Sequence, residues 1–189
     1  MNMSHSARRF SVASLRRQRG LSLFMVMIFL VILSILGVTA IQSSTFSALI
    51  AGNEADRTLA FQAAESALRD AEKDIAGACA AANCRTTPIS PETADIFTAA
   101  CNDGLCLPND TAPVWEQKTN WLTTAGSGKA VVYGTYTGAA ALPVVSQQPR
   151  YLIEYFKLGE AFVFRVSAVG YGAKDSTQVM LQTSVKALK

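Results

Sequence analysis

The chain has 189 residues, which is enough for one globular domain and one extended element. Its formal net charge of +3 has a local origin, because residues 1–20 contain five arginines and no acid, leaving 12 basic against 14 acidic residues elsewhere. The basic residues outside this segment are spread thinly, so composition excludes a nucleic-acid-binding surface, which needs clustered Lys and Arg. The only histidine is His5, so the body of the chain has no Ser–His or Cys–His pair and no histidine metal ligand. We therefore expect no enzymatic activity, no cofactor and no bound metal.

The segment after the arginines is strongly apolar. Residues 21–41 carry no charged side chain, and the charge-free stretch continues to Asn53. A bilayer core about 30 Å thick requires about 20 helical residues, so this segment can cross a membrane. The arginines in front of it predict that the N-terminus stays in the cytoplasm and that the body of the chain lies outside.

Three kinds of N-terminal segment share this pattern. A cleavable secretory signal would end at small residues such as Val38-Thr39-Ala40, but its apolar part is usually about 7–15 residues long. An ordinary uncleaved membrane anchor is the second kind. The third is a leader that is cut where the arginines meet the apolar block, so that the whole apolar helix stays on the mature chain.

The next segment, residues 46–75, is rich in Ala, Leu, Glu, Arg and Lys, and these residues favour a helix. It predicts one continuous helix from residue 21 to about residue 75. Its apolar residues recur at spacings of three and four, which places them on one face. We expect the following five residues to pack on the body of the protein: Phe61, Ala64, Leu68, Ala71 and Ile75.

The junction RQRG followed by LSLFMVMIFLVILSILGVTA resembles the type III signal of type IV pilins and type II secretion pseudopilins. In those families a prepilin peptidase cuts after the glycine and methylates the new N-terminus. The resemblance implies cleavage between Gly20 and Leu21, with N-methylation of Leu21. The sequence AGNEADRTLAFQAAESALRDAE, residues 51–72, resembles the segment that follows the membrane helix in PilX-type minor pilins.

One position departs from the pilin pattern. Most pilins carry a glutamate five residues into the mature chain, thought to pair with the N-terminal amine of a neighbouring subunit, and here this position is Met25. Because a lone carboxylate in hydrocarbon is costly, methionine eases residence in the membrane but removes a docking contact. The K-type pseudopilins of filament tips resemble this pattern, so we expect this protein at or near a pilus tip.

The region 77–128 holds all four cysteines and four of the six prolines, and its composition is typical of loops. Cys79 and Cys84 enclose four residues, and so do Cys101 and Cys106. An even number of cysteines outside the cytoplasm predicts two disulfides, and the local pairs are favoured among three possible connectivities. A zinc site with four cysteine ligands is the alternative, which the expected compartment disfavours.

The last third of the chain is rich in Val, Tyr, Phe and Thr. Four segments predict strands: 130–137, 150–157, 161–172 and 176–187. Short connectors between the last three predict antiparallel neighbours. The sequences FRVSAVGYG and TQVMLQTSV within these segments also resemble the C-terminal sheet of PilX-like pilins. The expected fold class is α+β and pilin-like, with a long N-terminal helical spine packed against a C-terminal antiparallel sheet.

These observations divide the chain into four parts: a leader peptide at 1–20, an N-terminal helix at 21–76, a loop region with disulfides at 77–128 and a sheet at 129–189. The resemblance implies a minor pilin that primes assembly of a type IV pilus and supports twitching motility and adhesion. It implies residence in the bacterial inner membrane, with the head in the periplasm, and then in the surface pilus.

The implied partners are other minor pilins, the major pilin, the prepilin peptidase and, before assembly, inner-membrane lipid. Two alternatives stay open. One is a minor pseudopilin of a type II secretion system, and the other is a bitopic membrane protein whose periplasmic domain binds a ligand.

Overall fold

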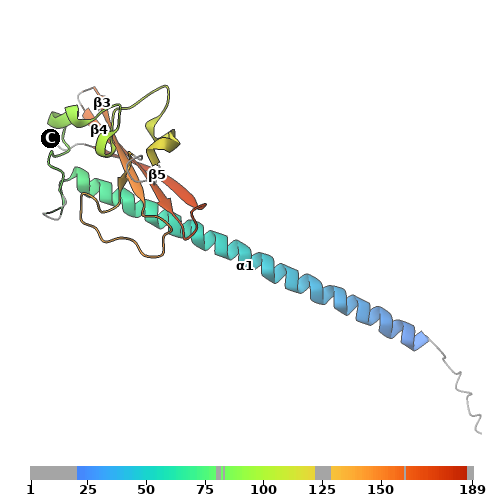
Figure 1. Ribbon diagram of the computed structural model, residues 1–189. Coiled ribbons are helices and arrows are strands. Elements are labelled where there is room, and N and C mark those ends of the chain that lie inside the picture. Colours follow the sequence, from blue (N-terminus) through green and yellow to red (C-terminus); the bar gives the residue numbers. More distant parts are fainter. Residues whose placement is uncertain (1–20, 80–81, 83, 122–128, 160, 187–189) are drawn as a thin grey trace, which may run out of the picture. The chain divides into compact units, whose positions relative to one another are not determined.

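The computed structural model describes the following residues: 21–79, 82, 84–121, 129–159 and 161–186 (Figure 1). The predicted leader, residues 1–20, lies outside these ranges. The chain divides into two compact units, residues 1–49 and residues 50–189.

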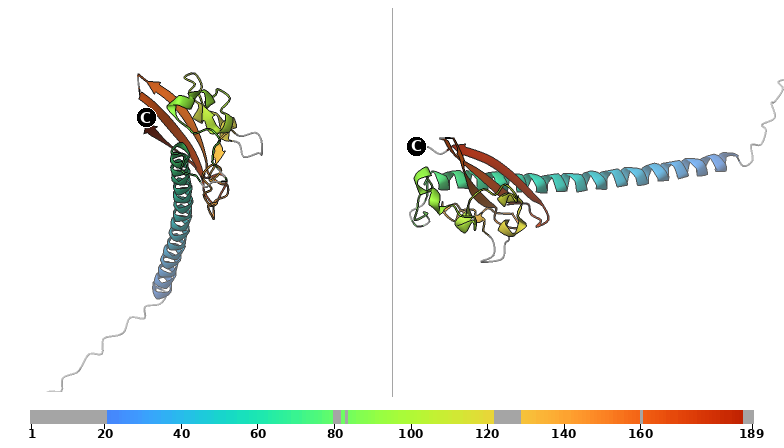
Figure 2. Two further views of the ribbon diagram at one scale, coloured as in Figure 1. Left: turned by 90° about the vertical axis from the view of Figure 1, so that its left-hand side faces the viewer. Right: turned by 90° about the horizontal axis from the view of Figure 1, so that it is seen from above.

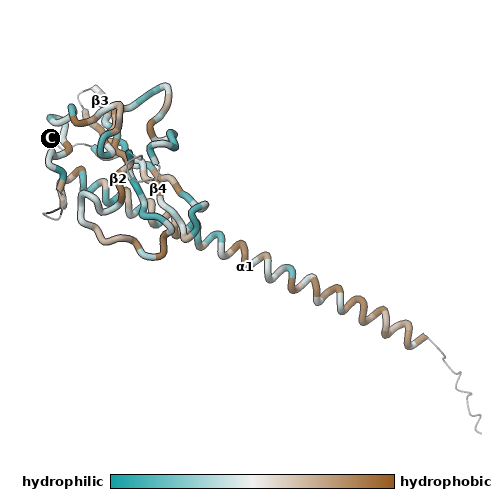
Figure 3. The backbone as a smooth tube through the Cα atoms, in the orientation of Figure 1, coloured by the Kyte–Doolittle hydropathy of each residue, from teal (hydrophilic) through white to brown (hydrophobic). Residues whose placement is uncertain are grey.

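Helix α1 runs from Leu21 to Ile75 without a break, which confirms the predicted long helix. In the first unit its described side chains are all exposed, and Figure 3 shows that apolar residues predominate there. Ser34, Thr39 and Thr45 donate their hydroxyl hydrogens to carbonyl oxygens three or four residues earlier, so these polar groups are satisfied within the helix. By length and composition, α1 can cross a membrane.

The second unit contains a five-stranded sheet in the order β1-β3-β4-β5, with β2 paired to β3 outside this path. The strands are β1 (Leu105–Cys106), β2 (Val131–Val132), β3 (Arg150–Leu158), β4 (Ala161–Tyr171) and β5 (Gln178–Lys186). Two short 3₁₀ helices lie between α1 and β1: η1 (Pro91–Ile96) and η2 (Asn102–Gly104). Two more lie between β1 and β2: η3 (Val114–Glu116) and η4 (Lys118–Trp121). The α+β, pilin-like fold class is confirmed.

Two details of the predicted sheet need correction. The sheet is mixed, because β1 pairs with β3 in parallel, whereas the other strand pairs are antiparallel as expected. The segment 130–137 is not a full strand, since only Val131 and Val132 pair with β3. The chain turns away at Gly134, which has a left-handed φ of 80°.

The second half of α1 lies along one face of the strands (Figure 2). The buried apolar residues of this half are all small: Ala60, Ala63, Ala64, Ala67 and Ala71. Residues Leu68 and Ile75 of the predicted face are partly buried against the same core, but Phe61 is 47% exposed, so its expected packing is wrong. The buried stripe is centred on the alanines, and Phe61 lies to one side of it.

This alanine face permits an unusually close contact with β4. A Cβ atom added to Gly170 would lie 2.2 Å from both the carbonyl oxygen of Ala60 and the backbone nitrogen of Ala64. Glycine on the strand, opposite small residues on the helix, lets the two backbones approach this closely.

The opposite face of the sheet is covered over β3. Leu152 lies there in a small core with Val114, Ala130 and the disulfide of Cys101 and Cys106. The residues between β1 and β2 therefore form a small core with Leu152 on this face, separate from the larger core that α1 covers.

Candidate functional site

Three aspartates on α1 are buried in the second unit, and none of them is among the residues predicted to be functional. Asp56, Asp70 and Asp74 lie 14 and four residues apart, spacings that place them on one face of a helix. Each accepts a hydrogen bond from a different loop, and Asp74 accepts another from a residue of β3. Their same-face spacing within a stripe of alanines is visible in the sequence, but their burial depends on the sheet that covers this stripe.

Asp56 holds the connector between β4 and β5. Its Oδ1 atom accepts a hydrogen bond of 2.6 Å from the backbone N–H of Ala173. A Cβ atom on Gly172 would lie 2.5 Å from the same oxygen, so the connector reaches the carboxylate because this position is glycine.

Asp70 holds the loop after β2. The backbone N–H of Gly134 donates to its Oδ2 atom at 2.8 Å, and the Thr137 hydroxyl donates to its Oδ1 atom. These contacts hold Gly134 and Thr137 against α1, so the predicted strand 130–137 does not continue beyond Val132.

Asp74 accepts hydrogen bonds from the side chains of both a loop residue and a strand residue. Arg85 donates from Nε to both carboxylate oxygens, at 2.8 and 2.9 Å, and the hydroxyl of Tyr151 donates to Oδ2 at 2.8 Å. Burial raises the pKa of Asp74, while the Arg85 guanidinium and the Tyr151 hydrogen bond act in the opposite direction. Burial, together with the adjacent Asp74 charge, also raises the pKa of Tyr151.

Arg85 links the two cysteine loops to the helix. Its guanidinium stacks 3.7 Å from the centre of the Tyr136 ring and donates a 2.9 Å hydrogen bond to the carbonyl oxygen of Asp103. One arginine therefore joins α1, the loop after β2 and the turn at η2.

The cysteines form the local pairs Cys79–Cys84 and Cys101–Cys106, the connectivity that the sequence favoured. The second pair is buried and the first lies near the surface. Within the described ranges, no group of three or more His, Cys, Asp or Glu side chains is arranged to hold a metal ion.

A second ion pair lies across β3 and β4 and joins a buried Glu154 to a partly exposed Arg165. Arg165 donates to both oxygens of Glu154, at 2.7 and 2.8 Å, and stacks 4.7 Å from the ring centre of Phe156. The register places Glu154 directly opposite Arg165, so this pair fixes the alignment of the two strands.

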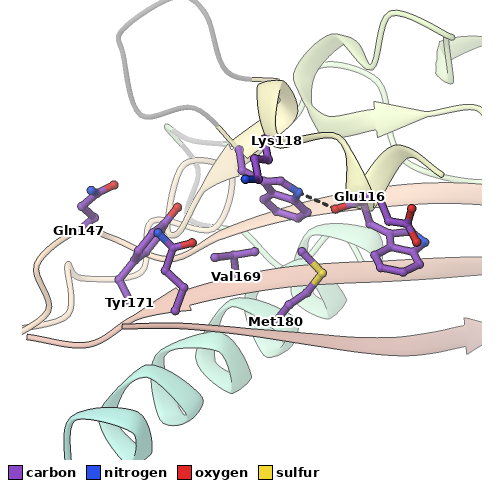
Figure 4. A pocket seen from close by; sticks show the side chains of 9 residues that line it. Glu116, Lys118, Gln147, Val169, Tyr171 and Met180 are labelled. Carbon is purple, nitrogen blue, oxygen red and sulfur yellow. Dashed lines mark hydrogen bonds between the residues drawn. The ribbon is translucent and has the colours of Figure 1, made fainter. Parts of the chain in front are cut away.

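A groove of about 590 Å³ opens on the sheet face that faces away from α1 (Figure 4). Val169, Tyr171 and Met180 lie along β4 and β5 on one side, and Trp115 and Trp121 come from η3 and η4. The indole N–H of Trp121 donates to the carbonyl oxygen of Trp115 at 2.9 Å, which fixes the two 3₁₀ helices together. The other residues that line the groove are Glu116, Lys118, Gln147 and Gln178.

The predicted processing junction is only partly described. Gly20 lies outside the described residues, whereas Leu21 is the first residue of α1. Met25, where most pilins have glutamate, is 63% exposed on the apolar part of the helix.

An exposed apolar helix whose second half is fastened to a mixed sheet defines the class of pilin-like filament subunits. Two family models match the chain: PilX N-terminal over residues 19–69, and the C-terminal part of the type IV pilus assembly protein PilX over residues 102–187. The chain belongs to the PilX family and is a type IV pilus assembly component. Neither a curated protein nor a solved structure gives a significant match to the chain.

Proposed function

We propose that this protein is a minor pilin that joins other minor pilins to prime assembly of a type IV pilus. The observation that carries the proposal is that the PilX matches cover both the apolar helix and the sheet. A helix without charged side chains over residues 21–53 is stable in lipid before assembly, and it can pack against the helices of other subunits afterwards. The major pilin and the prepilin peptidase are the further partners.

Processing forms part of this proposal. A prepilin peptidase removes residues 1–20 by cutting between Gly20 and Leu21, and Leu21 is then methylated. A cut at this position keeps the described helix, Leu21–Ile75, on the mature chain, whereas a cut after Ala40 would remove residues 21–40 of it.

Mass analysis of the native N-terminus tests this step. We expect a chain that begins at methylated Leu21. A chain that begins at Ile41 would identify a secretory signal, and an intact Met1 would identify a plain anchor; either result contradicts the processing step. Replacement of Gly20 by leucine should leave the leader attached.

A deletion strain tests the role in assembly. We expect few or no surface pili, lost twitching and weaker adhesion, all restored by the wild-type chain, with type II secretion unchanged. Normal piliation with lost secretion would instead support the pseudopilin alternative.

The position in the filament is proposed from Met25. Without a carboxylate there, the subunit lacks a partner for the N-terminal amine of a neighbouring subunit, which a subunit at the tip does not need. Immunogold labelling of a tagged chain should mark filament ends, and labelling along the shaft would reject the tip position.

A further inference from the structure

Strand β5 forms an open edge of the sheet. It pairs with β4 and, within the described residues, with no other strand. Its sequence QVMLQTSVK contains no proline and one charged residue, Lys186, at the end of the strand. Edge strands are usually protected by charges, prolines, bulges or a covering segment, and β5 carries little of this protection.

The register identifies the main-chain groups that face outward. The N–H of Gly172 donates to the carbonyl oxygen of Thr177, so this opposed pair is a hydrogen-bonded one. Because hydrogen-bonded and non-bonded pairs alternate along an antiparallel ladder, Val179 and every second residue after it bond to β4. The main-chain groups of the intervening residues point away from the sheet: Gln178, Met180, Gln182, Ser184 and Lys186.

Hollows adjoin this edge on both faces of the sheet. The groove that contains Trp115 and Met180 lies beside the first part of β5, on the face away from α1 (Figure 4). A second hollow, of about 280 Å³, adjoins Val185 at the other end and is also lined by Ile75 and Phe164. Both are lined mostly by apolar side chains.

A third hollow, of about 490 Å³, is polar. It is lined by Asn53 and Arg57 of α1 and by residues 176–180. Within the described part of the chain, no carboxylate forms an ion pair with Arg57. This hollow therefore suits a negatively charged side chain.

We propose that β5 accepts an added β-strand from a different polypeptide. Residues opposed across neighbouring strands share a face, so the residue opposite Met180 enters the tryptophan-lined groove, and the residue opposite Val185 enters the hollow at Ile75. The residue opposite Val179 lies on the α1 side, near Arg57. The added strand thus carries two apolar residues five positions apart, one opposite Met180 and one opposite Val185. It carries an acidic residue opposite Val179, next to the first of these.

A second copy of β5 does not meet this description, since the strand contains neither Asp nor Glu to place near Arg57. Main-chain pairing supplies affinity in such complexes and the alternate side chains supply specificity. If the proposed function holds, the strand comes from a neighbouring pilus subunit.

Site-specific photo-crosslinking of the full chain in native cells tests the proposal. A photo-reactive residue is placed at Gln178, Gln182 or Lys186, which lie four residues apart on one face, and the crosslinked partner residues are mapped by mass spectrometry. We expect the mapped partner position to move by four residues for each step along β5. Asp110, on the exposed loop between β1 and η3, is the control position and should give no such series.

A paired substitution tests the main-chain contact. Ser184→Pro removes one outward N–H and no bond to β4, and we expect it to reduce the crosslinks at least tenfold, whereas Ser184→Ala should retain them. Near-ultraviolet circular dichroism establishes that both variants are folded. Absent crosslinks at β5, crosslinks without the four-residue series, or equal crosslinking by both variants would each overturn the proposal.

The outcome separates this proposal from the proposed function. An ordered crosslink series in cells whose piliation does not depend on this chain leaves strand addition standing and removes the pilus role. Loss of pili in the deletion strain without the crosslink series supports the pilus role and removes strand addition.

Discussion

Asp74 and Arg85 form a contact in which each side chain depends on the other. Their side chains are 2% and 8% exposed, so removing one partner leaves a buried charge without a counter-ion. We expect Arg85→Ala to lower the free energy of unfolding by about 3–5 kcal/mol, as measured by urea denaturation followed through tryptophan fluorescence.

Arg69→Ala is the matched control for this substitution. Arg69 pairs with Glu65 one turn away on α1, and these side chains are 71% and 43% exposed. Its loss should change stability by no more than about 0.5 kcal/mol. Similar losses from the two variants would contradict the importance assigned to the buried pair.

Tyr151 makes the stability depend on alkaline pH. Its pKa is raised in the folded protein, so above about pH 10 the unfolded chain releases this proton first and the folded state loses stability. Tyr151→Phe should cost about 1.5–3 kcal/mol at pH 7, because it removes a hydrogen bond to a charged group. The difference in free energy of unfolding between the wild-type chain and Tyr151→Phe should then shrink as pH rises from 9 to about 11. Denaturation curves across this range measure it, and a constant difference would count against the inferred ionisation.

At the scale of elements, the contact of α1 with β4 depends on backbone proximity. Gly170→Ala would place a methyl group against the helix backbone at two points, so α1 and the sheet must separate. We expect a loss of about 3 kcal/mol, at the upper end for overpacked cores.

Gly52→Ala is the control for the same chemical change on the same helix. An added Cβ atom there meets nothing within 4 Å, so improved helix propensity should raise stability by up to about 1 kcal/mol. Thermal unfolding in detergent compares the two variants. If Gly170→Ala unfolds at the wild-type temperature, the close contact does not hold in solution.

The elements with regular patterns were predictable from sequence. Strands β4 and β5 follow the alternation of apolar residues, β3 follows a segment rich in Tyr, Phe and Ile, and α1 follows a long run of apolar and helix-forming residues. The predicted strand at 130–137 was wrong because Asp70 accepts bonds from that loop, an interaction between residues more than 60 positions apart. No local pattern carries that information.

The buried aspartates illustrate the same limit. An acidic residue on a helix is ordinarily solvated, and only the approach of the sheet removes Asp56, Asp70 and Asp74 from water. Phe61 shows the converse, since its spacing matches the apolar face but the alanines determine where the sheet makes contact. The cysteine pairs were predictable in outline because their short spacing permits local closure.

At the scale of the whole molecule, the apolar part of α1 predicts integration into a bilayer. Leu30 lies near the middle of the segment 21–41, where an arginine costs about 2.5–3.5 kcal/mol. We expect Leu30→Arg to shift much of the protein from the membrane fraction to the soluble fraction after alkaline carbonate extraction.

Leu23→Arg provides the comparison, because an arginine near the end of the segment can extend its charged group to the membrane surface. This variant should remain with the membrane. Equal extraction of both variants would show that the position along the helix has no influence on membrane retention.

The three aspartate contacts also have a mechanical consequence. Asp56, Asp70 and Asp74 hold three separate loops to one stretch of helix, and Asp74 also holds Tyr151 of β3. Tension applied along α1 within residues 50–75 is therefore shared among three anchorages in shear, and detachment requires them to rupture together rather than one after another. We expect such a subunit to keep these loops attached to α1 when a filament is under tension.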